Sequence, residues 1–474
     1  MRRTKIVATI GPVSESDDMF DRLIAAGMDV ARMNFSHGSH EEHAERIRRA
    51  RAAAQRAGKP LTILQDLQGP KIRTGKLVNG EPIQLRTGSR FTITTHDMLG
   101  TSERVSTTYT ALVDDVQPGD RILLSDGLLH LRVIEAHDGE VITEVTAGGM
   151  LRERQGINLP GVNVSAPSLT EKDIEDLEFG LSQNVDWVAL SFVRRPENVE
   201  ELRSRIRAAG KTTPIMAKIE KPEALDHLDE IIAAVDGVMV ARGDLGVEIP
   251  PEQVPVAQKR IIEICNRLGK PVITATQMLD SMIRNPQPTR AEASDVANAI
   301  IDGTDAVMLS GETAVGAYPV ESIDMMCRIA AVTEGSGLLD TYTDEISPQL
   351  LQKFRINAPL AVVAHAISPG VPVRAIVAFT TSGATAMRVA TQRPSCPIFA
   401  LTSDEQVYHR LGVVWGVTPI MAPGIADLVE LSEFVNTHFK AQGLVDIGEA
   451  LVITGGHPIM GQGKTDFIKV LTVT

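Results

Sequence analysis

Three charged residues stand where two neighbouring strands of a parallel sheet would end. Lys218 and Glu220 lie two positions apart at the end of the apolar segment 215–219, so their side chains would point to the same side of an extended chain. Asp244 follows the next apolar segment, 238–241. Ligand sites of parallel α/β folds lie at the carboxyl ends of the strands. A lysine between two carboxylates there indicates a divalent cation and an anionic substrate, although surface salt bridges would give the same pattern.

A second set of polar residues alternates along the segment 30–36. Arg32, Asn34 and Ser36 would face one way, and the apolar residues between them would face the other. Polar groups in register on a central strand are costly unless something uses them, and an amphipathic edge strand is the alternative. The strand expected next in the chain ends near another carboxylate, that of Asp66.

An alternation of strands and helices extends these observations to a (β/α)₈ barrel, an α/β fold. Ser16 and Thr170 stand ahead of amphipathic segments and predict helix starts. Polar residues close the later strands; each alone could be a helix cap, but together on one rim they would form a site. These residues are Ser191, Thr276, Gln277, Ser310 and Glu312. The eight expected strands are 5–11, 30–36, 63–67, 187–192, 215–219, 238–241, 271–276 and 306–310.

Two further domains are expected beside the barrel. Helical periodicity disappears over 71–166, where short strand-like segments alternate with Asn-Gly and Asp-Gly turns. We expect a small β-barrel there, inserted where it could act as a lid. The catalytic barrel would then comprise 1–70 and 167–335, and 336–474 would form an open α/β domain. In that last domain, the segment 461–465 resembles a Walker A loop but lacks its first glycine, so we reject it.

One loop of the third domain, 380–385, joins an expected strand to a helix N-terminus. Hydroxyls and backbone N–H groups at such a place suit a phosphate, although serine and threonine also serve as plain helix caps. We therefore expect a phosphorylated effector, a sugar phosphate or AMP, to bind this loop. Its residues are Thr380, Thr381, Ser382, Gly383, Ala384 and Thr385.

Composition argues against several classes of protein. The chain has 47 basic and 60 acidic residues, a net charge of −13 and no basic tract, which argues against nucleic acid as a partner. No apolar run approaches membrane-spanning length, and the N-terminus lacks the features of a signal peptide, so we expect no membrane association. Three widely spaced cysteines match neither a disulfide framework nor a metal site, and this indicates a reducing cytoplasm.

Nine motifs, in order along the whole chain, resemble those of the pyruvate kinases, and in particular of bacterial, potassium-independent members. They are KIV (5–7), TIGP (9–12), RMNFSHG (32–38), GPKIRTG (69–75), NLPG (158–161), MAKIEK (216–221), ARGDLG (241–246), TQML (276–279) and MLSGET (308–313). A single short motif matches by chance often, but a set in this order and spacing does not.

The resemblance implies phosphoryl transfer from phosphoenolpyruvate to ADP, giving pyruvate and ATP, by an allosterically regulated homotetramer. It implies that Glu220 and Asp244 hold Mg²⁺, for which Mn²⁺ could substitute, and that a second Mg²⁺ travels with ADP. Lys218 and Arg32 would neutralise the phosphoryl group in transfer.

The resemblance also assigns the remaining contacts to the substrates. The backbone N–H groups of Gly243 and Asp244 and the hydroxyl of Thr276 would bind the substrate carboxylate. Thr276, Ser310 and water would protonate the enolate. The residues implied to bind the nucleotide are Pro12, Asn34, His37 and Arg73.

Three departures from the family pattern carry expectations of their own. Potassium-dependent members bind the ion with oxygens equivalent to those of Asn34, Ser36, Asp66 and Leu67. They have a glutamate where this chain has Lys71, whose ammonium group could supply the missing charge, so we expect a catalytic role for Lys71 and no potassium requirement. A solvated lid lysine is the alternative. Glu42 replaces a tyrosine of the adenine pocket, which predicts loose base selectivity, and Gln155 replaces a lid lysine.

Two rival functions remain at this stage. A Mg²⁺-dependent aldolase or lyase barrel acting on pyruvate or oxaloacetate would share the carboxylate pair but not Arg32, Asn34, Ser36 and Arg73. A non-catalytic sensor of sugar phosphates or nucleotides would be indicated by loss of Lys218 or of the carboxylates, and none is lost. The effector, the preferred nucleotide and the cooperativity are left open by the sequence.

Overall fold

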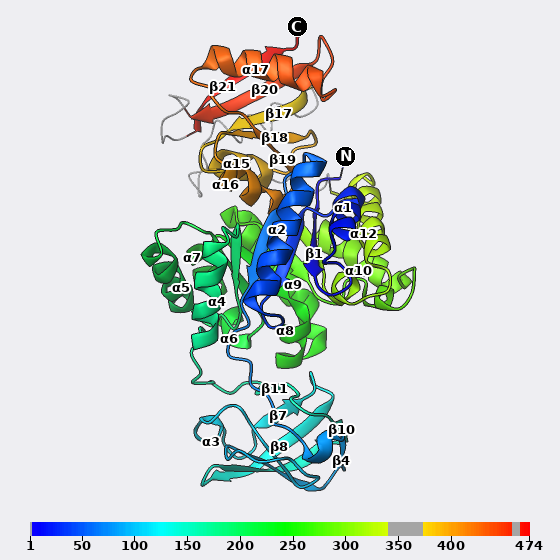
Figure 1. The fold of residues 1–474 in the computed structure, drawn as a ribbon, viewed down its shortest axis with the longest axis vertical. Helices are drawn as coiled ribbons and strands as arrows, with labels where there is room; N and C mark the ends of the chain where they lie inside the picture. The colour runs from blue at the N-terminus through cyan, green and yellow to red at the C-terminus, as the bar shows by residue number, and fades with distance from the viewer. Residues whose placement is uncertain (1, 340–372, 457–464) are drawn as a thin grey trace.

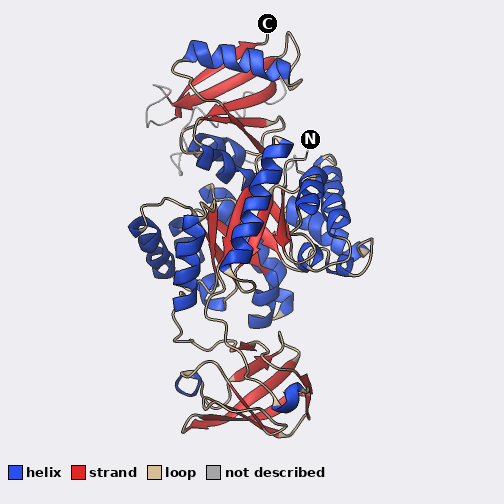
Figure 2. Cartoon of the chain, viewed as in Figure 1, coloured by secondary structure: helices blue, strands red, loops and turns tan. Residues whose placement is uncertain are grey.

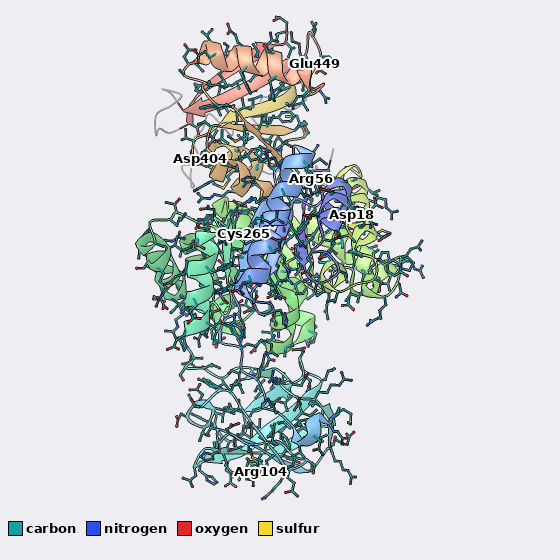
Figure 3. The ribbon with its side chains drawn as sticks, in the orientation of Figure 1. Asp18, Arg56, Arg104, Cys265, Asp404 and Glu449 are labelled. Atoms are coloured by element: carbon teal, nitrogen blue, oxygen red, sulfur yellow. The ribbon has the colours of Figure 1, made fainter. Side chains whose placement is uncertain are left out.

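The computed structural model describes residues 2–339, 373–456 and 465–474, which form three parts along one long axis. Figure 1 shows a β-rich part at one end, a barrel in the middle and a C-terminal α/β part at the other end. In Figure 3, Arg104 and Glu449 lie near the two opposite ends of the molecule. The expected boundaries at 70/71, 166/167 and 335/336 stay predictions, and most of the rejected Walker-like segment lies outside the described residues.

The middle part is a closed barrel of eight parallel strands, which confirms the expected fold. The strands are β1 (Lys5–Ile10), β2 (Val30–Asn34), β3 (Thr62–Asp66), β12 (Trp187–Leu190), β13 (Ile215–Ile219), β14 (Gly237–Ala241), β15 (Val272–Ala275) and β16 (Ala306–Leu309). Several end one or two residues earlier than predicted, so Ser36, Thr276 and Ser310 lie just after strands rather than in them. Because a closed ring has no edge, β2 is not an edge strand, and that alternative is wrong.

Helices surround the barrel, as Figure 2 shows. The side chains of Ser16 and Thr170 accept hydrogen bonds from the first turns of their helices, as predicted. The single helix expected between β13 and β14 is two short helices, α6 (Pro222–Asp226) and α7 (Leu228–Ala234), because His227 has non-helical torsion angles. The other main helices are α1 (Asp17–Ala26), α2 (His40–Ala57), α4 (Glu171–Ser182), α5 (Pro196–Ala208), α8 (Arg242–Glu248), α9 (Val254–Leu268), α10 (Arg290–Ile301), α11 (Gly311–Ala314) and α12 (Pro319–Glu334).

The β-rich part has a six-stranded sheet and a two-stranded sheet. The segment 72–75 joins the two outer strands of the larger sheet: Thr74 bridges Thr107 on one side and Arg73 bridges Gly156 on the other, which closes the sheet into the predicted small β-barrel. The strands are β4 (Ile83–Leu85), β5 (Arg90–Thr94), β6 (Arg104–Ser106), β7 (Arg121–Leu124), β8 (Leu129–His137), β9 (Glu140–Ala147), β10 (Gly149–Leu151) and β11 (Ile157–Asn158). They enclose a buried apolar cluster of their own.

The C-terminal part is a five-stranded open sheet flanked by helices, as predicted. Its strands are β17 (Val373–Phe379), β18 (Ile398–Thr402), β19 (Val417–Met421), β20 (Ala450–Gly456) and the antiparallel β21 (Thr465–Thr472); its helices are α15 (Ala384–Thr391), α16 (Glu405–Arg410) and α17 (Leu428–Ala441).

This part packs against the N-terminal ends of the barrel strands. Lys5 Nζ donates a hydrogen bond to the carbonyl of Val417, and the interior residue Met216 belongs to the same buried apolar cluster as Val389 and Leu411. The N-terminal end of the barrel is thus covered, and the carboxyl ends of the strands face the β-rich part. No helix within the described ranges is long and apolar enough to span a membrane.

Candidate active site

A buried cluster of charges lies at the carboxyl ends of β2, β3 and β13. Lys218 Nζ is 3.5 Å from Asp66 Oδ1 and 3.4 Å from Glu220 Oε2, and both carboxylate side chains are only 2% exposed. Nζ also donates a hydrogen bond of 2.7 Å to the hydroxyl of Ser191. The sequence placed Lys218 and Glu220 at one strand end. The structure brings them together with Asp66, which ends β3.

Arg32 provides the second positive charge of this cluster. Its Nε and Nη2 each lie 2.7 Å from Asp66 Oδ2, and its Nη1 donates to the hydroxyl of Thr9 at 3.0 Å. Burial raises the pKa of Asp66, but the charges of Lys218 and Arg32 outweigh burial and hold that pKa below its ordinary value. Asp66 is therefore an anion that holds two cations in place.

Lys218 stays protonated in this environment. Burial lowers its pKa, but the three carboxylates of Asp66, Glu220 and Asp244 reverse the effect and raise the pKa above its ordinary value. A lysine held as a cation can neutralise a phosphate or another developing anion, and it cannot act as a base near neutral pH.

Of the two carboxylate oxygens of Glu220, one accepts a hydrogen bond and the other does not. Oε1 accepts a hydrogen bond of 2.7 Å from the backbone N–H of Phe192, whereas the buried Oε2 has no hydrogen-bond partner in the part of the chain described. Burial raises the pKa of Glu220, and the charge of Asp244 raises it further. Oε2 lies 3.4 Å from Lys218 Nζ, but a buried carboxylate oxygen that accepts no hydrogen bond is still costly, and a bound cation would stabilise it.

The donor set fits Mg²⁺ in part. Exposed Asp244 lines the same pocket as Glu220, so two carboxylates face one space. Within the described ranges, no group of three or more histidine, cysteine, aspartate or glutamate residues is arranged to hold a metal ion. Mg²⁺ commonly keeps waters and substrate oxygens beside one or two carboxylates, so the remaining ligands would come from those.

The pocket over this cluster unites most of the predicted site. Predicted residues that line it are Arg32, Asn34, Ser36, His37, Lys71, Lys218, Glu220 and Asp244. Partial burial lowers the pKa of His37, and the positive charges of Arg73, Lys71 and Arg32 lower it further. Residues that the sequence analysis missed are Phe192, Arg194, Lys221, Glu223 and Glu248. They follow strands of the barrel or lie in the helices after them, and position just after a strand was the only signal that could have found them.

The β-rich part closes one side of the pocket. Asn158 of β11 donates from Nδ2 to Glu248 Oε1 at 2.9 Å, and the same oxygen accepts from Lys221 Nζ at 2.6 Å. Asp126 and Gly156 of this part also line the pocket. A lid domain must contact the mouth of the pocket, and the contact between Asn158 and Glu248 meets this requirement.

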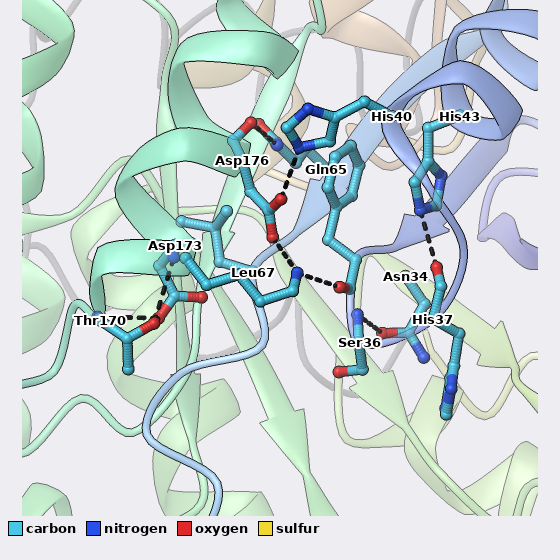
Figure 4. Close-up of polar contacts among 12 residues, drawn as sticks. Asn34, Ser36, His37, His40, His43, Gln65, Leu67, Thr170, Asp173 and Asp176 are labelled. Carbon is cyan, nitrogen blue, oxygen red and sulfur yellow. Dashed lines mark hydrogen bonds and ion pairs between the residues drawn. The ribbon is translucent and has the colours of Figure 1, made fainter.

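The loop after β2 is held by hydrogen bonds to its backbone, shown in Figure 4. The Asn34 side-chain oxygen accepts from the N–H of Ser36 at 3.1 Å. Lys172 Nζ donates to the carbonyl of Phe35 at 2.9 Å, and His43 Nε2 lies 2.8 Å from the carbonyl of His37. The bonded carbonyls belong to the residues that flank Ser36, so this loop has one defined shape facing the pocket.

A buried carboxylate supports that loop from α4. Asp176 lies 2.7 Å from His40 Nε2 and 2.5 Å from Lys172 Nζ. Burial also lowers the pKa of the neighbouring His43 to about 4, so its ring is neutral at neutral pH. His43 therefore adds no positive charge to the loop at neutral pH.

Other predicted residues lie beside the pocket rather than in its lining. Gly243 N–H donates to the Thr276 hydroxyl at 2.6 Å, and the buried Ser310 hydroxyl has no partner among the residues described. Arg73 Nη1 donates to the carbonyl of Arg154 in the β-rich part at 3.0 Å, and Pro12 is exposed.

Two residues that depart from the family pattern, Glu42 and Gln155, form hydrogen bonds with nearby backbone groups. The Glu42 carboxylate accepts from the N–H of Ser39 and caps α2, and Gln155 Nε2 donates to the carbonyl of Glu153. Their side chains are therefore held by neighbouring backbone groups in this structure.

The predicted effector loop forms the turn between β17 and α15. Thr380 is buried and its hydroxyl accepts from the N–H of Gly383 at 2.9 Å, while the Thr385 hydroxyl contacts that of Thr465 at 2.9 Å. Ser382 is exposed and Thr381 is half-buried. Two of the four hydroxyls thus shape the turn, and the other two remain for a ligand.

Comparison with known proteins gives one result over the whole chain. The family described as pyruvate kinase, barrel domain, matches residues 1–323, and the family described as pyruvate kinase, alpha/beta domain, matches residues 351–471. A pyruvate kinase of Geobacillus stearothermophilus is 49% identical over 480 residues, covering 100% of this chain and 81% of that protein. Pyruvate kinases of Sporosarcina psychrophila and of Staphylococcus aureus (strain MRSA252) are 47% and 48% identical, covering 99% of this chain and 80% of each protein.

Replacement of Glu220 by glutamine should weaken binding of a divalent cation. The change removes the negative charge of a carboxylate whose Oε2 accepts no hydrogen bond, and we expect Mn²⁺ affinity to fall by at least roughly tenfold, since substitution of residues that only support metal ligands already costs 10- to 100-fold. Electron paramagnetic resonance of free Mn²⁺ would measure it. Asp186→Asn is the matched control: Asp186 is a buried carboxylate that accepts from the N–H of Ile63 at the other end of the barrel. Equal Mn²⁺ affinity of Glu220→Gln and the unmodified protein would contradict Glu220 as a ligand.

Proposed function

The chain belongs to the pyruvate kinase family, and from this premise we propose that it transfers the phosphoryl group of phosphoenolpyruvate to ADP, giving pyruvate and ATP. The observation that carries the proposal is the buried cluster in which Lys218 lies between Asp66 and Glu220 at the strand ends. Neither the aldolase or lyase function nor the sensor function is proposed, because the family matches extend over both the barrel and the C-terminal part.

The reaction breaks the bond between phosphorus and the enolate oxygen, and it forms a bond between phosphorus and a terminal oxygen of ADP. Glu220 and Asp244 would hold Mg²⁺, or Mn²⁺ in its place, which when bound supplies positive charge next to the phosphoryl oxygens. Lys218 and Arg32 would face the group in transfer. Such chemistry depends mostly on positioning and electrostatics, and two buried cations held by Asp66 are suited to it.

The enolate then takes a proton at carbon to become pyruvate. We assign the substrate carboxylate to the N–H groups of Gly243 and Asp244 and to the hydroxyl of Thr276. Thr276, Ser310 and water would deliver the proton. Two observations support these roles: the Gly243 N–H and the Thr276 hydroxyl lie in direct contact, so both could meet one carboxylate, and the buried Ser310 hydroxyl has no hydrogen-bond partner among the residues described.

The nucleotide phosphates would bind on the side of the pocket formed by the loop after β2. Asn34 and His37 line the pocket there, Arg73 would approach as the β-rich part closes, and Pro12 would contact the nucleotide from the loop after β1. We also propose a cytoplasmic homotetramer, which sedimentation velocity would test: a monomer at working concentration would contradict it.

Lys218→Met should lower kcat by at least roughly 100-fold while phosphoenolpyruvate still binds, because the lost charge acts mainly in the transition state. A lactate dehydrogenase-coupled assay with phosphoenolpyruvate, ADP and Mg²⁺ would measure it. Lys5→Met is the matched control, since Lys5 is a buried lysine at the opposite end of the barrel. If kcat of Lys218→Met stayed within about tenfold of the unmodified enzyme while KM rose, Lys218 would be a binding residue instead.

We propose further that Lys71 takes the place of a monovalent cation. Two of the family's cation ligands have partners here: the Leu67 carbonyl accepts from Ser191 Oγ at 2.7 Å, and Asp66 pairs with Arg32. Lys71 lines the pocket, has no ion-pair partner in the described parts of the chain, and helps to lower the pKa of His37. Its charge is therefore free to face a phosphate.

The unmodified enzyme should be active with Mg²⁺ in tetramethylammonium buffer that lacks sodium and potassium. Lys71→Glu should lose most activity and regain part of it when potassium is added, and Lys76→Glu, on an exposed lysine of the same segment, should do neither. Activation of the unmodified enzyme by more than about tenfold on adding potassium would rule out the substitution of lysine for the ion.

We propose that the loop between β17 and α15 binds the phosphate of an allosteric effector, a sugar phosphate or AMP. Exposed Ser382 lies in this loop, so Ser382→Asp should abolish activation because its carboxylate repels the phosphate. Ser395→Asp, on an exposed serine before β18, should respond normally. Initial rates at low phosphoenolpyruvate with glucose 6-phosphate, fructose bisphosphate or AMP would show the difference; unchanged activation of Ser382→Asp would exclude this loop.

A further inference from the structure

The turn after β15 has a backbone conformation that needs support. Thr276 has φ +70° and Gln277 has φ +53°, both in the left-handed region. A β-branched residue is rarely found there, because its side chain crowds the backbone. Residues in such conformations persist only where the surroundings hold them, and they concentrate at functional sites.

Arg242 donates hydrogen bonds to two backbone carbonyls of this turn. Its Nε donates to the carbonyl of Ala275 at 3.2 Å, and its Nη2 donates to the carbonyl of Thr276 at 2.8 Å. The guanidinium group is planar and rigid, so two bonds from it fix the orientation of two successive peptide groups.

Arg242 is itself held by side chains of two helices. Asp295 of α10 accepts from both Nη1 and Nη2 at 2.7 Å, and Gln258 of α9 accepts from Nη1 at 3.2 Å. The Arg242 side chain is 12% exposed, and Nε, Nη1 and Nη2 all donate to groups of the protein. It can therefore act on a substrate only through another residue.

That residue is Thr276. Its hydroxyl accepts from the N–H of Gly243, the residue after Arg242, and donates to the carbonyl of Ala275, both at 2.6 Å. A Cβ atom at position 243 would lie 3.3 Å from the same hydroxyl, so the backbone approaches it closely. Arg242 thus fixes the Thr276 hydroxyl from both sides, by its guanidinium group and by the peptide that follows it.

We propose that Arg242 is a positioning residue for the protonation step, which holds the Thr276 hydroxyl where it meets the substrate. This inference rests on the role given to Thr276 under Proposed function. Arg242 itself touches no reacting atom, and Asp295 holds its guanidinium group by two hydrogen bonds.

A double-mutant cycle between Arg242→Lys and Thr276→Ala tests the inference. Lysine keeps the charge opposite Asp295 but cannot bond both carbonyls, so kcat should fall roughly 10- to 100-fold, as expected for a misplaced group. In the Thr276→Ala background, Arg242→Lys should change kcat by less than about twofold, because residues that act as one unit are not additive. Exchange of the methyl protons of pyruvate in D₂O, followed by proton NMR, should fall in parallel, since it reverses the protonation step alone.

Controls separate loss of Thr276 positioning from a general loss of structure. Arg203→Lys changes a partly buried arginine that bonds Asp236 and the carbonyl of Ala234 near the other end of the barrel, and it should leave kcat and proton exchange unchanged. If Arg242→Lys lowers the melting temperature below the assay range, Asp295→Asn, which leaves Arg242 in place, should show the same loss and the same lack of additivity.

The outcomes are distinct. Additive effects in the cycle, or normal kcat and exchange in Arg242→Lys, would overturn the inference while phosphoryl transfer stands. Normal kcat of Thr276→Ala would overturn both the inference and the role assigned to Thr276. Absence of phosphoryl transfer in the unmodified protein would overturn the proposed function itself.

Discussion

The structure depends on charges buried at the carboxyl ends of the barrel strands. Arg32 and Lys218 face the carboxylates of Asp66 and Glu220, with Asp244 at the rim. Desolvating such groups costs on the order of several kcal/mol per ion, and the cost is offset only when every charge has partners. Two cationic side chains face three carboxylates, which leaves one negative charge in excess, and Glu220 Oε2 lies 3.4 Å from Lys218 Nζ but accepts no hydrogen bond. A divalent cation corrects both, and the same cation then attracts an anionic substrate.

Packing at the N-terminal ends of the barrel strands keeps the charge cluster in a fixed position. Its interior is continuous with the apolar side chains of the C-terminal part, so the N-terminal ends of the strands are packed and do not move independently. The side chains at the opposite ends can then be polar and still keep fixed positions. The β-rich part adds a wall to the pocket, and the contact between Asn158 and Glu248 joins it to the barrel across the pocket mouth.

The sequence predicted what short-range patterns determine. Period-two alternation placed Arg32, Asn34 and Ser36 on one face of β2, and strand ends placed Lys218, Glu220 and Asp244 on one rim. It could not predict the turn at Thr276, because the left-handed backbone there depends on contacts between residues far apart in the chain. Arg242 and Asp295 are 53 positions apart, and no local pattern links them.

Anomalous diffraction from crystals grown with Mn²⁺ and a non-reactive analogue of phosphoenolpyruvate would test the central claim most directly. The account predicts one Mn²⁺ peak within bonding distance of Glu220 Oε2 and of the Asp244 carboxylate, with the analogue's phosphate facing Lys218 and Arg32. A Mn²⁺ peak away from both carboxylates, or a phosphate bound elsewhere with the charge cluster unchanged, would contradict it.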